Sequence, residues 1–461
     1  MPHFDLVVIG AGSGNAVVDD RFRDQRVAIV SEGPFGGTCL NAGCIPSKML
    51  AATAEVADTV RDSGRHDVRA ELEGTAWPEV RRRVFGRLDD QARDGERGRR
   101  ETPWLTVHRG RARFTGERRL VVESERSEVE LTADRIVVAA GGRPVVPPPV
   151  ADSGVPYETS DTVMRLERVP AHLVVLGGGY IAAELARVFH SAGARITVVE
   201  QEDRLLAQQD ESVAEAFTSS VRGQWDLRLG RSVTDVGGAP GDLVVTLDDG
   251  SVVRGDTLLV AAGRRPNSDR LDLGAAGIRC DDSGLVEVDG QLRTSAPGVW
   301  ALGDITDGGP QLKHVANRQA AVVAHNLLDP DRPRTMDYTA VPAAVFTRPQ
   351  IAQVGLTEQR ARERGLAYVV GWRRYQDVAY GWALEDEEGF CKVLVDPASG
   401  LLVGAHVLGP QAATLIQPLV LAMATRMTAE DLARTPMWVH PALTEVVENA
   451  LLDAVEKVRA G

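Results

Sequence analysis

Residues 36–48 read Gly-Gly-Thr-Cys-Leu-Asn-Ala-Gly-Cys-Ile-Pro-Ser-Lys, which places four residues between Cys39 and Cys44. In a regular helix, residues five apart lie about 140° apart around the axis, so these cysteines do not share a face. A disulfide between them requires a distorted turn, and a strained disulfide is easily reduced. This favours a redox couple. Two other interpretations stay open for the pair alone: small buried side chains, or half of a zinc site that the isolated Cys280 and Cys391 do not complete.

The composition indicates a globular protein of several domains. The 461 residues are too many for one core, and 43% are hydrophobic and 25% charged. A net charge of −13 excludes nucleic acid as a partner, because nothing would neutralise the phosphates. The arginine-rich run 81–100 also carries acidic residues, so we interpret it as a solvated helix face.

The sequence gives no sign of a membrane or a secretory pathway. No stretch is long and apolar enough for a membrane span, and the first residues lead directly into a strand rather than a signal peptide. Four cysteines in a chain of this length indicate a reducing compartment, where a disulfide is a catalytic feature. We expect a cytoplasmic protein.

A strand–turn–helix–strand unit opens the chain. Residues 4–9 are an apolar run, residues 10–15 read Gly-Ala-Gly-Ser-Gly-Asn, a helix-compatible stretch follows, and residues 27–30 form the next strand. This is the context that a dinucleotide-binding fingerprint requires.

Individual positions of this first fingerprint have distinct expected roles. Gly10 permits the tight turn, and Gly12 lets the backbone approach a pyrophosphate. The match is imperfect, because Asn15 occupies the third glycine position and Gly14 stands one place early. Glu32, at the end of the second strand, is expected to hold a ribose.

A second unit of the same kind begins at residue 173. The strand 173–176 precedes Gly177-Gly178-Gly179-Tyr180-Ile181-Ala182, which fits G-x-G-x-x-A, a helix runs on from Ala183, and residues 195–200 form the next strand. Two accidental glycine turns are the alternative. Two fingerprints in the right context predict two bound dinucleotides.

The segments between and after the fingerprints carry weaker signals. Residues 51–115 are expected to be helical, followed by short strands to Val138. Small residues end two strands, at 139–144 and 261–267, where they allow either a close backbone approach to a ligand or simply a turn. Residues 298–304 are expected to form a strand that ends in Asp304, whose carboxylate can accept from a sugar hydroxyl.

The C-terminal part changes to the pattern of an antiparallel sheet. Strands are expected at 341–345, 367–371, 390–395 and 401–408, and helices at 357–364, 411–426 and 441–459. His440 precedes Glu445 by five residues at the start of the last helix. These two side chains can form a hydrogen-bonded dyad that tunes the imidazole, although a capping or surface histidine is commoner for such a sequence alone.

Taken together, these parts resemble the FAD-dependent pyridine nucleotide–disulfide oxidoreductases of the glutathione reductase and lipoamide dehydrogenase group. The likeness covers essentially the whole chain, and residues 36–48 are its most specific motif. Within the group, the chain is most similar to the mycothione reductases, and the segments that carry this likeness are 10–15, 160–165, 313–317, 341–347, 377–383 and 438–443.

The resemblance implies an α/β fold with two doubly wound, Rossmann-like dinucleotide-binding domains and a C-terminal α+β dimerisation domain. The expected domains are an FAD-binding domain at 1–150, an NAD(P)-binding domain at 151–270, the remainder of the FAD and central domain at 271–336, and the dimerisation domain at 337–461. No metal site is expected.

The resemblance also implies a relay of electrons from NAD(P)H through FAD and a Cys39–Cys44 disulfide to a small-molecule disulfide, with mycothione favoured. Cys44 faces the flavin and Cys39 attacks the substrate, while Lys48 pairs with Glu184 near the flavin. The resemblance further implies an obligate homodimer, in which His440 of the partner subunit is the acid and Glu445 orients its imidazole. Tyr180 is implied to cover the nicotinamide. The implied cofactor-binding residues are Gly10, Gly12, Ser13, Gly14, Glu32, Gly37, Thr38, Lys48, Ala140, Gly141, Gly177, Gly179, Tyr180, Ile181, Glu184, Glu200, Gly263, Arg264, Gly303, Asp304, Lys313 and His314.

One segment departs from the pattern of the NADPH-using members. Gln201 and Ala207 stand where arginines that bind the 2′-phosphate are expected, and Glu200 stands where a ribose diol is held. A carboxylate attracts two hydroxyls and repels a phosphate, so we expect NADH to be used at least as well as NADPH. Two rival functions remain at this point: a dihydrolipoamide dehydrogenase, and a flavin-binding interaction protein that has lost turnover.

Overall fold

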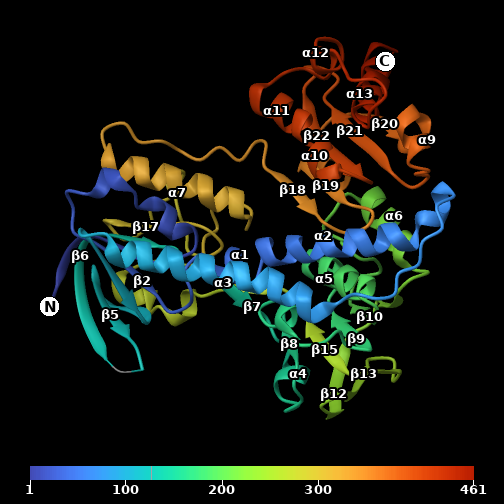
Figure 1. Cartoon of the computed structure of the whole chain (residues 1–461). Coiled ribbons are helices and arrows are strands. Elements are labelled where there is room, and N and C mark those ends of the chain that lie inside the picture. Colours follow the sequence, from blue (N-terminus) through green and yellow to red (C-terminus); the bar gives the residue numbers. More distant parts are fainter. Residues whose placement is uncertain (126, 461) are drawn as a thin grey trace.

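The computed structural model describes residues 1–125 and 127–460. The chain forms two parallel-stranded α/β units and a C-terminal antiparallel sheet with helices, which confirms the predicted fold class. In Figure 1 the first sheet lies on the left, the second at the bottom, and the C-terminal sheet at the upper right. Within the described residues, no helix has the length and apolar character needed to cross a membrane.

The first sheet has its N-terminal strand near the centre. Its parallel strands follow the order β3-β2-β1-β6, β17 also pairs with β6, and an antiparallel β4–β5 ribbon extends it. Residues 6–9 of β1 pair with 27–30 of β2 and 135–138 of β6. The run 6–9 is buried on both faces, as expected for a parallel sheet covered on both sides. The strands are β1 (His3–Ile9), β2 (Val27–Ser31), β3 (Leu105–Arg109), β4 (Arg111–Gly116), β5 (Arg119–Glu123), β6 (Glu128–Val138) and β17 (Val299–Ala301).

The second sheet repeats this topology in the order β11-β10-β9-β15-β8, all parallel, and an antiparallel meander β12-β13-β14 packs on it. The strands are β8 (Glu158–Thr159), β9 (His172–Leu176), β10 (Arg195–Glu200), β11 (Asp226–Leu229), β12 (Val233–Ala239), β13 (Asp242–Leu247), β14 (Val252–Gly255) and β15 (Thr257–Val260). The helices are α4 (Pro148–Ala151), α5 (Tyr180–Ser191) and α6 (Glu211–Val221), and the two-stranded β7 (Gly142–Pro144) and β16 (Arg264–Pro266) join the two units.

The C-terminal sheet is antiparallel in the order β18-β19-β22-β21-β20. Its strands are β18 (Pro342–Val345), β19 (Ile351–Gly355), β20 (Val369–Arg374), β21 (Phe390–Val395) and β22 (Leu402–Leu408). The helices are α8 (Glu358–Glu363), α9 (Ala379–Ala383), α10 (Ala412–Leu415), α11 (Gln417–Thr425), α12 (Ala429–Arg434) and α13 (Thr444–Ala460). Gly371 lets β20 approach α13 closely, because a Cβ there would stand 2.1 Å from the carbonyl oxygen of Ala450.

Two long helices run between these units: α2 (Cys44–Arg61), which follows the one-turn α1 (Gly37–Asn41), and α3 (Trp77–Glu101). A third long helix, α7 (Lys313–Leu328), packs on the first sheet. Figure 1 shows α2 running from the first unit to α5 and the C-terminal sheet, with α3 alongside. The apolar side of α3 is buried and its arginine-rich side is solvated, as expected for the run 81–100.

A buried ion cluster also joins the second unit to the C-terminal sheet. The ammonium of Lys392 lies 2.7 Å from Asp210 and 2.6 Å from Glu358, and its side chain is only 4% exposed. Asp210 is the N-cap of α6, accepting from the Ser212 amide, and accepts a further bond from the Glu358 amide. The ammonium of Lys457 lies on the surface instead, 2.8 Å from a carboxylate oxygen of Asp453.

The structure corrects three expected elements. The helix expected after the first glycine turn is two 3₁₀ turns, Ser13–Val17 and Asp20–Phe22, because Val18 is extended and Asp19 caps a new turn. Residues 105–115 are strands rather than helix, since their alternating side chains complete the first sheet.

The third correction concerns a later strand. The strand expected over 298–304 ends at Ala301, so Asp304 lies in the turn that follows. The strand β19 and the helices α9 and α12 were not anticipated, because each is short and bounded by turn residues.

Candidate active site

A cavity of about 1320 Å³ opens where the carboxyl ends of the first sheet meet the N-terminal ends of α2, α5 and α7. It is lined by most of the predicted residues: Gly10, Gly12, Ser13, Glu32, Gly37, Thr38, Cys39, Cys44, Lys48, Ala140, Gly141, Tyr180, Ile181, Glu184, Arg264, Gly303, Asp304, Lys313 and His314. Seven predicted residues lie outside its lining: Gly14, Gly177, Gly179, Glu200, Gly263, His440 and Glu445.

The inner end of the cavity is a cradle of backbone. Gly10 has φ +111°, and a Cβ on it would stand 2.2 Å from the carbonyl oxygen of Ala139. A Cβ on Gly37 would stand 2.7 Å from the Cα of Gly12. Side chains at these positions would collide with this backbone, so the turns can pack this closely only with glycine there. Bare amides at closely packed turns suit a pyrophosphate, so the residues present fit a dinucleotide such as FAD.

Charged and polar side chains surround this cradle. The ammonium of Lys313, the first residue of α7, donates to Ser13 at 2.9 Å. Burial raises the pKa of the Asp304 carboxyl, while Arg264 and Lys313 lower it. The carboxylate of Glu32 accepts from Arg270 at 2.9 Å at the outer rim, so the residue predicted to hold a ribose has a protein partner there.

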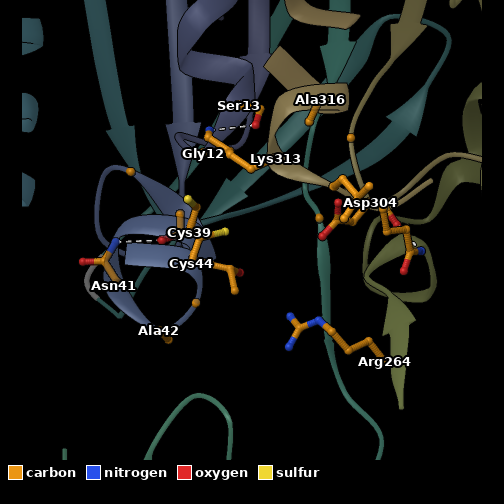
Figure 2. A pocket seen from close by; sticks show the side chains of 18 of the residues that line it. Gly12, Ser13, Cys39, Asn41, Ala42, Cys44, Arg264, Asp304, Lys313 and Ala316 are labelled. Carbon is orange, nitrogen blue, oxygen red and sulfur yellow. Dashed lines mark hydrogen bonds between the residues drawn. The ribbon is translucent and has the colours of Figure 1, made fainter. Parts of the chain in front are cut away.

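Cys39 and Cys44 face each other across a break between two helices. The helix α1 ends at Asn41 and α2 begins at Cys44, so Ala42 and Gly43 supply the distorted turn that their spacing predicts. A Cβ on Gly43 would stand 2.9 Å from the carbonyl oxygen of Thr38, which keeps this turn tight. The two side chains are free thiols in the structure. Figure 2 shows them on one side of the pocket, with Arg264 and Asp304 on the other.

The pKa values of the two thiols are shifted in opposite directions. The hydrogen bond from Cys39 lowers the pKa of the Cys44 thiol to about 6, helped by the charge of Lys48. The same hydrogen bond raises the pKa of Cys39, together with burial. The pair therefore holds one proton near neutral pH, on Cys39, and Cys44 is the thiolate. The position of Cys44 as the first residue of α2 also favours its negative charge.

Lys48 lies one helical turn after Cys44 and is fixed by two partners. Its ammonium donates to both carboxylate oxygens of Glu184 on α5, at 2.8 and 2.6 Å, as predicted for this pair. It also lies 4.7 Å from the centre of the Phe346 ring, a favourable cation–π geometry. Glu184 accepts a third bond, from the amide of Phe346 at 3.0 Å.

The second glycine turn lies at the start of α5. Gly177 has φ +108°, and a Cβ on it would stand 2.4 Å from the carbonyl oxygen of Ala261. Tyr180 begins the helix and is half exposed at the cavity wall. At the end of β10, the carboxylate of Glu200 accepts from the amides of Gly178 and, at 2.9 Å, of Glu202. The carboxylate therefore lies directly at the glycine turn.

His440 and Glu445 form the predicted dyad, with Nδ1 of the imidazole 2.7 Å from a carboxylate oxygen. The His440 side chain is 71% exposed and lies outside the cavity lining. Met437 and Val439 beside it are also strongly exposed. The chain alone thus does not bring this dyad to the cysteines.

Two residues of the site were missed by sequence reasoning. Phe346 is in a segment that carries the subfamily likeness, but nothing in its residue type predicts its place beside Lys48. Arg270 lies in a turn after the second unit, far in sequence from its partner Glu32. Only the fold brings these residues to the cavity.

Two family models match the chain. The model described as pyridine nucleotide-disulphide oxidoreductase matches residues 4–320. The model described as the dimerisation domain of the same oxidoreductases matches residues 341–451.

Known proteins match over nearly the full length. A mycothione reductase from Mycobacterium tuberculosis is 48% identical over 98% of this chain and 99% of the relative. A dihydrolipoyl dehydrogenase from Bacillus subtilis is 32% identical over 97% of this chain and 95% of the relative. The Cu(II) complex of the HOCl-induced flavoprotein disulfide reductase RclA from Escherichia coli has a TM-score of 0.87 and 26% identity, over 98% of this chain and 99% of that one.

Proposed function

The chain belongs to the pyridine nucleotide–disulphide oxidoreductases, which use FAD and a pyridine nucleotide, and on this premise we propose that its substrate is mycothione. The paired thiols that line the cavity carry the chemistry of the proposal: one is protonated, one is ionised, and both lie beside the glycine cradle. The identity of 48% to a mycothione reductase, against 32% to dihydrolipoyl dehydrogenases, supports the choice of disulfide.

In the proposed site, Gly10, Gly12, Ser13 and Gly37 would hold the FAD pyrophosphate. When bound, the flavin would supply a two-electron carrier between the nicotinamide and the cysteine pair. Lys48, held by Glu184, stabilises negative charge at the Cys44 thiolate. Tyr180, half exposed at the cavity wall, would cover the nicotinamide site until the nucleotide enters.

In the disulfide step the attack is assigned to Cys39, as the resemblance to the family implies, and because this thiol keeps its proton near neutral pH it needs a base. Cys39 loses its proton and attacks one substrate sulfur, so a Cys39–substrate disulfide forms and the first substrate thiolate leaves. Cys44 then attacks the sulfur of Cys39, which releases the second thiolate and leaves a Cys39–Cys44 disulfide. The substrate gains two electrons and the cysteine pair loses two.

We propose that the partner's His440 manages the proton in this step. The dimerisation domain supports a homodimer, and an exposed dyad that stands outside its own cavity is suited to act in a neighbouring subunit. The imidazole takes the proton of Cys39 and returns it to the leaving thiolate, and Glu445 stabilises the protonated ring.

A substrate panel tests the proposed disulfide. Purified protein with NADH or NADPH is assayed against mycothiol disulfide, glutathione disulfide and oxidised lipoamide. We expect the largest kcat/KM with mycothiol disulfide. A larger value with lipoamide would favour the second candidate, a dihydrolipoamide dehydrogenase, to which the Glu200 carboxylate also points.

We also propose that NADH is used at least as well as NADPH. The Glu200 carboxylate at the second glycine turn suits a ribose diol, and Glu202 and Asp203 add negative charge beside it. The nearby Arg204 is already paired with Asp203 and Glu211. A hundredfold preference for NADPH in kcat/KM would overturn this assignment.

A further inference from the structure

Arg187 is a buried cation that the proposed chemistry does not use. It lies on α5 three residues after Glu184, and its side chain is 5% exposed. On one side its guanidinium binds two carboxylates of α2: Asp58, with Nε and Nη2 both at 3.2 Å, and Glu55. This places Arg187 between the helix that begins at the redox pair and the helix that begins at the second glycine turn.

On its other side, the guanidinium binds the chain just after β18. Nη1 donates to the carbonyl oxygens of Phe346 and Thr347, at 3.2 and 3.1 Å. Glu184 accepts from the amide of Phe346 at 3.0 Å. The two side chains of α5 therefore hold Phe346 from both ends, Glu184 at its N–H and Arg187 at its carbonyl.

Both groups that fix Lys48 depend on this clamp. Its ammonium donates to Glu184 and faces the ring of Phe346. Without Arg187, the Phe346 carbonyl and the carboxylate of Asp58 would both lose a buried donor, and the chain after β18 would lose two of the bonds that hold it to α5. The ammonium of Lys48 would then lose its fixed distance from the cysteine pair.

We propose that Arg187 is a positioning residue that fixes the Lys48 ammonium beside the redox pair by clamping Phe346 against α5. This proposal rests on the proposed function in one respect, namely that the Lys48 ammonium stabilises the Cys44 thiolate. A side chain that served the stability of the α2–α5 contact alone would have no effect on the acidity of that thiol.

The charged and titratable groups around Cys44 determine the pKa of its thiol, which is the quantity that the test measures. Cys39 and Lys48 lower the pKa of Cys44, burial and Glu184 raise it, and Tyr180 lies close enough to interact with it. Arg187 is not among these groups. We therefore expect its removal to change the acidity of Cys44 through the placement of Lys48 and of its partner Glu184.

The test measures the acidity of Cys44 without turnover. In a Cys39→Ser holoprotein, which needs no reductant, the ultraviolet absorbance of the thiolate is titrated against pH, with the Cys39→Ser/Cys44→Ser protein as blank. The test variant combines Arg187→Met with Asp58→Asn, so that no buried carboxylate loses its cation. It is expected to raise the midpoint of the Cys44 titration by about 0.5 to 1 pH unit, because the Lys48 ammonium would lie a few ångströms further from the thiolate.

Two variants make the result decisive. Arg61→Met is the matched control, because Arg61 of α2 also binds α5, through the Ser191 carbonyl, and pairs with Asp58 on its own helix, but makes no hydrogen bond to Phe346. Its midpoint should be unchanged. Lys48→Met should raise the midpoint at least as much as the Arg187 variant. An unchanged midpoint in Lys48→Met contradicts the proposed function of Lys48; a shift there with none in the Arg187 variant overturns the clamp alone.

Discussion

Replacing Glu200 by glutamine should change the nucleotide preference of the protein. The carboxylate lies at the Gly178 amide, where we propose that the ribose of the nucleotide binds, and the change to an amide removes its charge but keeps one acceptor. The two carboxylate oxygens accept from separate amides, those of Gly178 and Glu202, so glutamine keeps one of these two bonds and loses the other, and the change stays local to this turn.

The magnitude follows from the charges. At roughly 5.5 Å, two unit charges interact by about 0.8 kcal/mol in water and about 3 kcal/mol near a protein surface. A phosphate of about −1.5 to −2 charge, partly screened by salt, is therefore repelled by about 2 kcal/mol, or about 30-fold in affinity. Loss of a charge-assisted bond to the ribose weakens NADH by about 1 kcal/mol, or about fivefold. The NADPH to NADH ratio of kcat/KM should rise roughly a hundredfold.

The assay is steady-state reduction of the disulfide with each nucleotide, in wild type, Glu200→Gln and Glu202→Gln. The last is the matched control, because Glu202 is an exposed neighbouring carboxylate that contributes only its amide to Glu200. Its ratio should change by less than about threefold, as expected for a screened surface charge. A ratio in Glu200→Gln that equals that of the control would refute the assignment of Glu200 to the ribose.

Three further outcomes are expected. His440→Ala should slow reoxidation by the disulfide by about a hundredfold or more while leaving flavin reduction by nicotinamide intact, and stopped-flow traces in which both steps slow equally would refute the proton role. Lys392→Met should lower stability by about 3–5 kcal/mol because it leaves Asp210 buried without its cation, and a Tm equal to wild type would contradict this. In the reduced protein the pKa of Cys44 is lowered from 9.0 to about 6. Between these two values the native state is ionised while the unfolded state still binds the proton. The free energy of unfolding, relative to that of Cys44→Ser, should therefore rise by about 1 kcal/mol from pH 6 to 9. A flat difference in Tm across this range would contradict the shift, and above pH 9 the raised pKa of Cys39 should reverse the trend.

The parts of the fold that follow a strong periodic pattern could be predicted from the sequence. The edges of β10 and β21 were predicted to the residue, because each is an apolar run bounded by polar turns. The first crossover was mispredicted as helix: a glycine turn followed by apolar residues suits a helix, but the chain reaches β2 too soon to complete one. There, Arg99 of α3 donates to the carbonyl oxygens of Asn15 and Val18, which satisfies groups that a helix would have bonded internally.

The candidate site could be predicted where a motif places its members close in sequence. The turn between Cys39 and Cys44, and the dyad of His440 with Glu445, follow from spacing. The clamp at Phe346 could not be predicted, because Arg187 reaches it from a different unit of the fold. The domain boundaries and the roles assigned to individual site residues stay predictions.

The contacts of the four lysines have a practical consequence for chemistry on this protein. Lys48 and Lys313 are held in the cavity by Glu184 and Ser13, and Lys392 is buried, so among the lysines a reagent that seeks amines finds the exposed Lys457 on the last turn of α13 first. Mild acylation should therefore modify Lys457 together with the exposed α-amine of Met1. Neither residue lines the cavity, so a dye attached at these two points would leave it open to solvent.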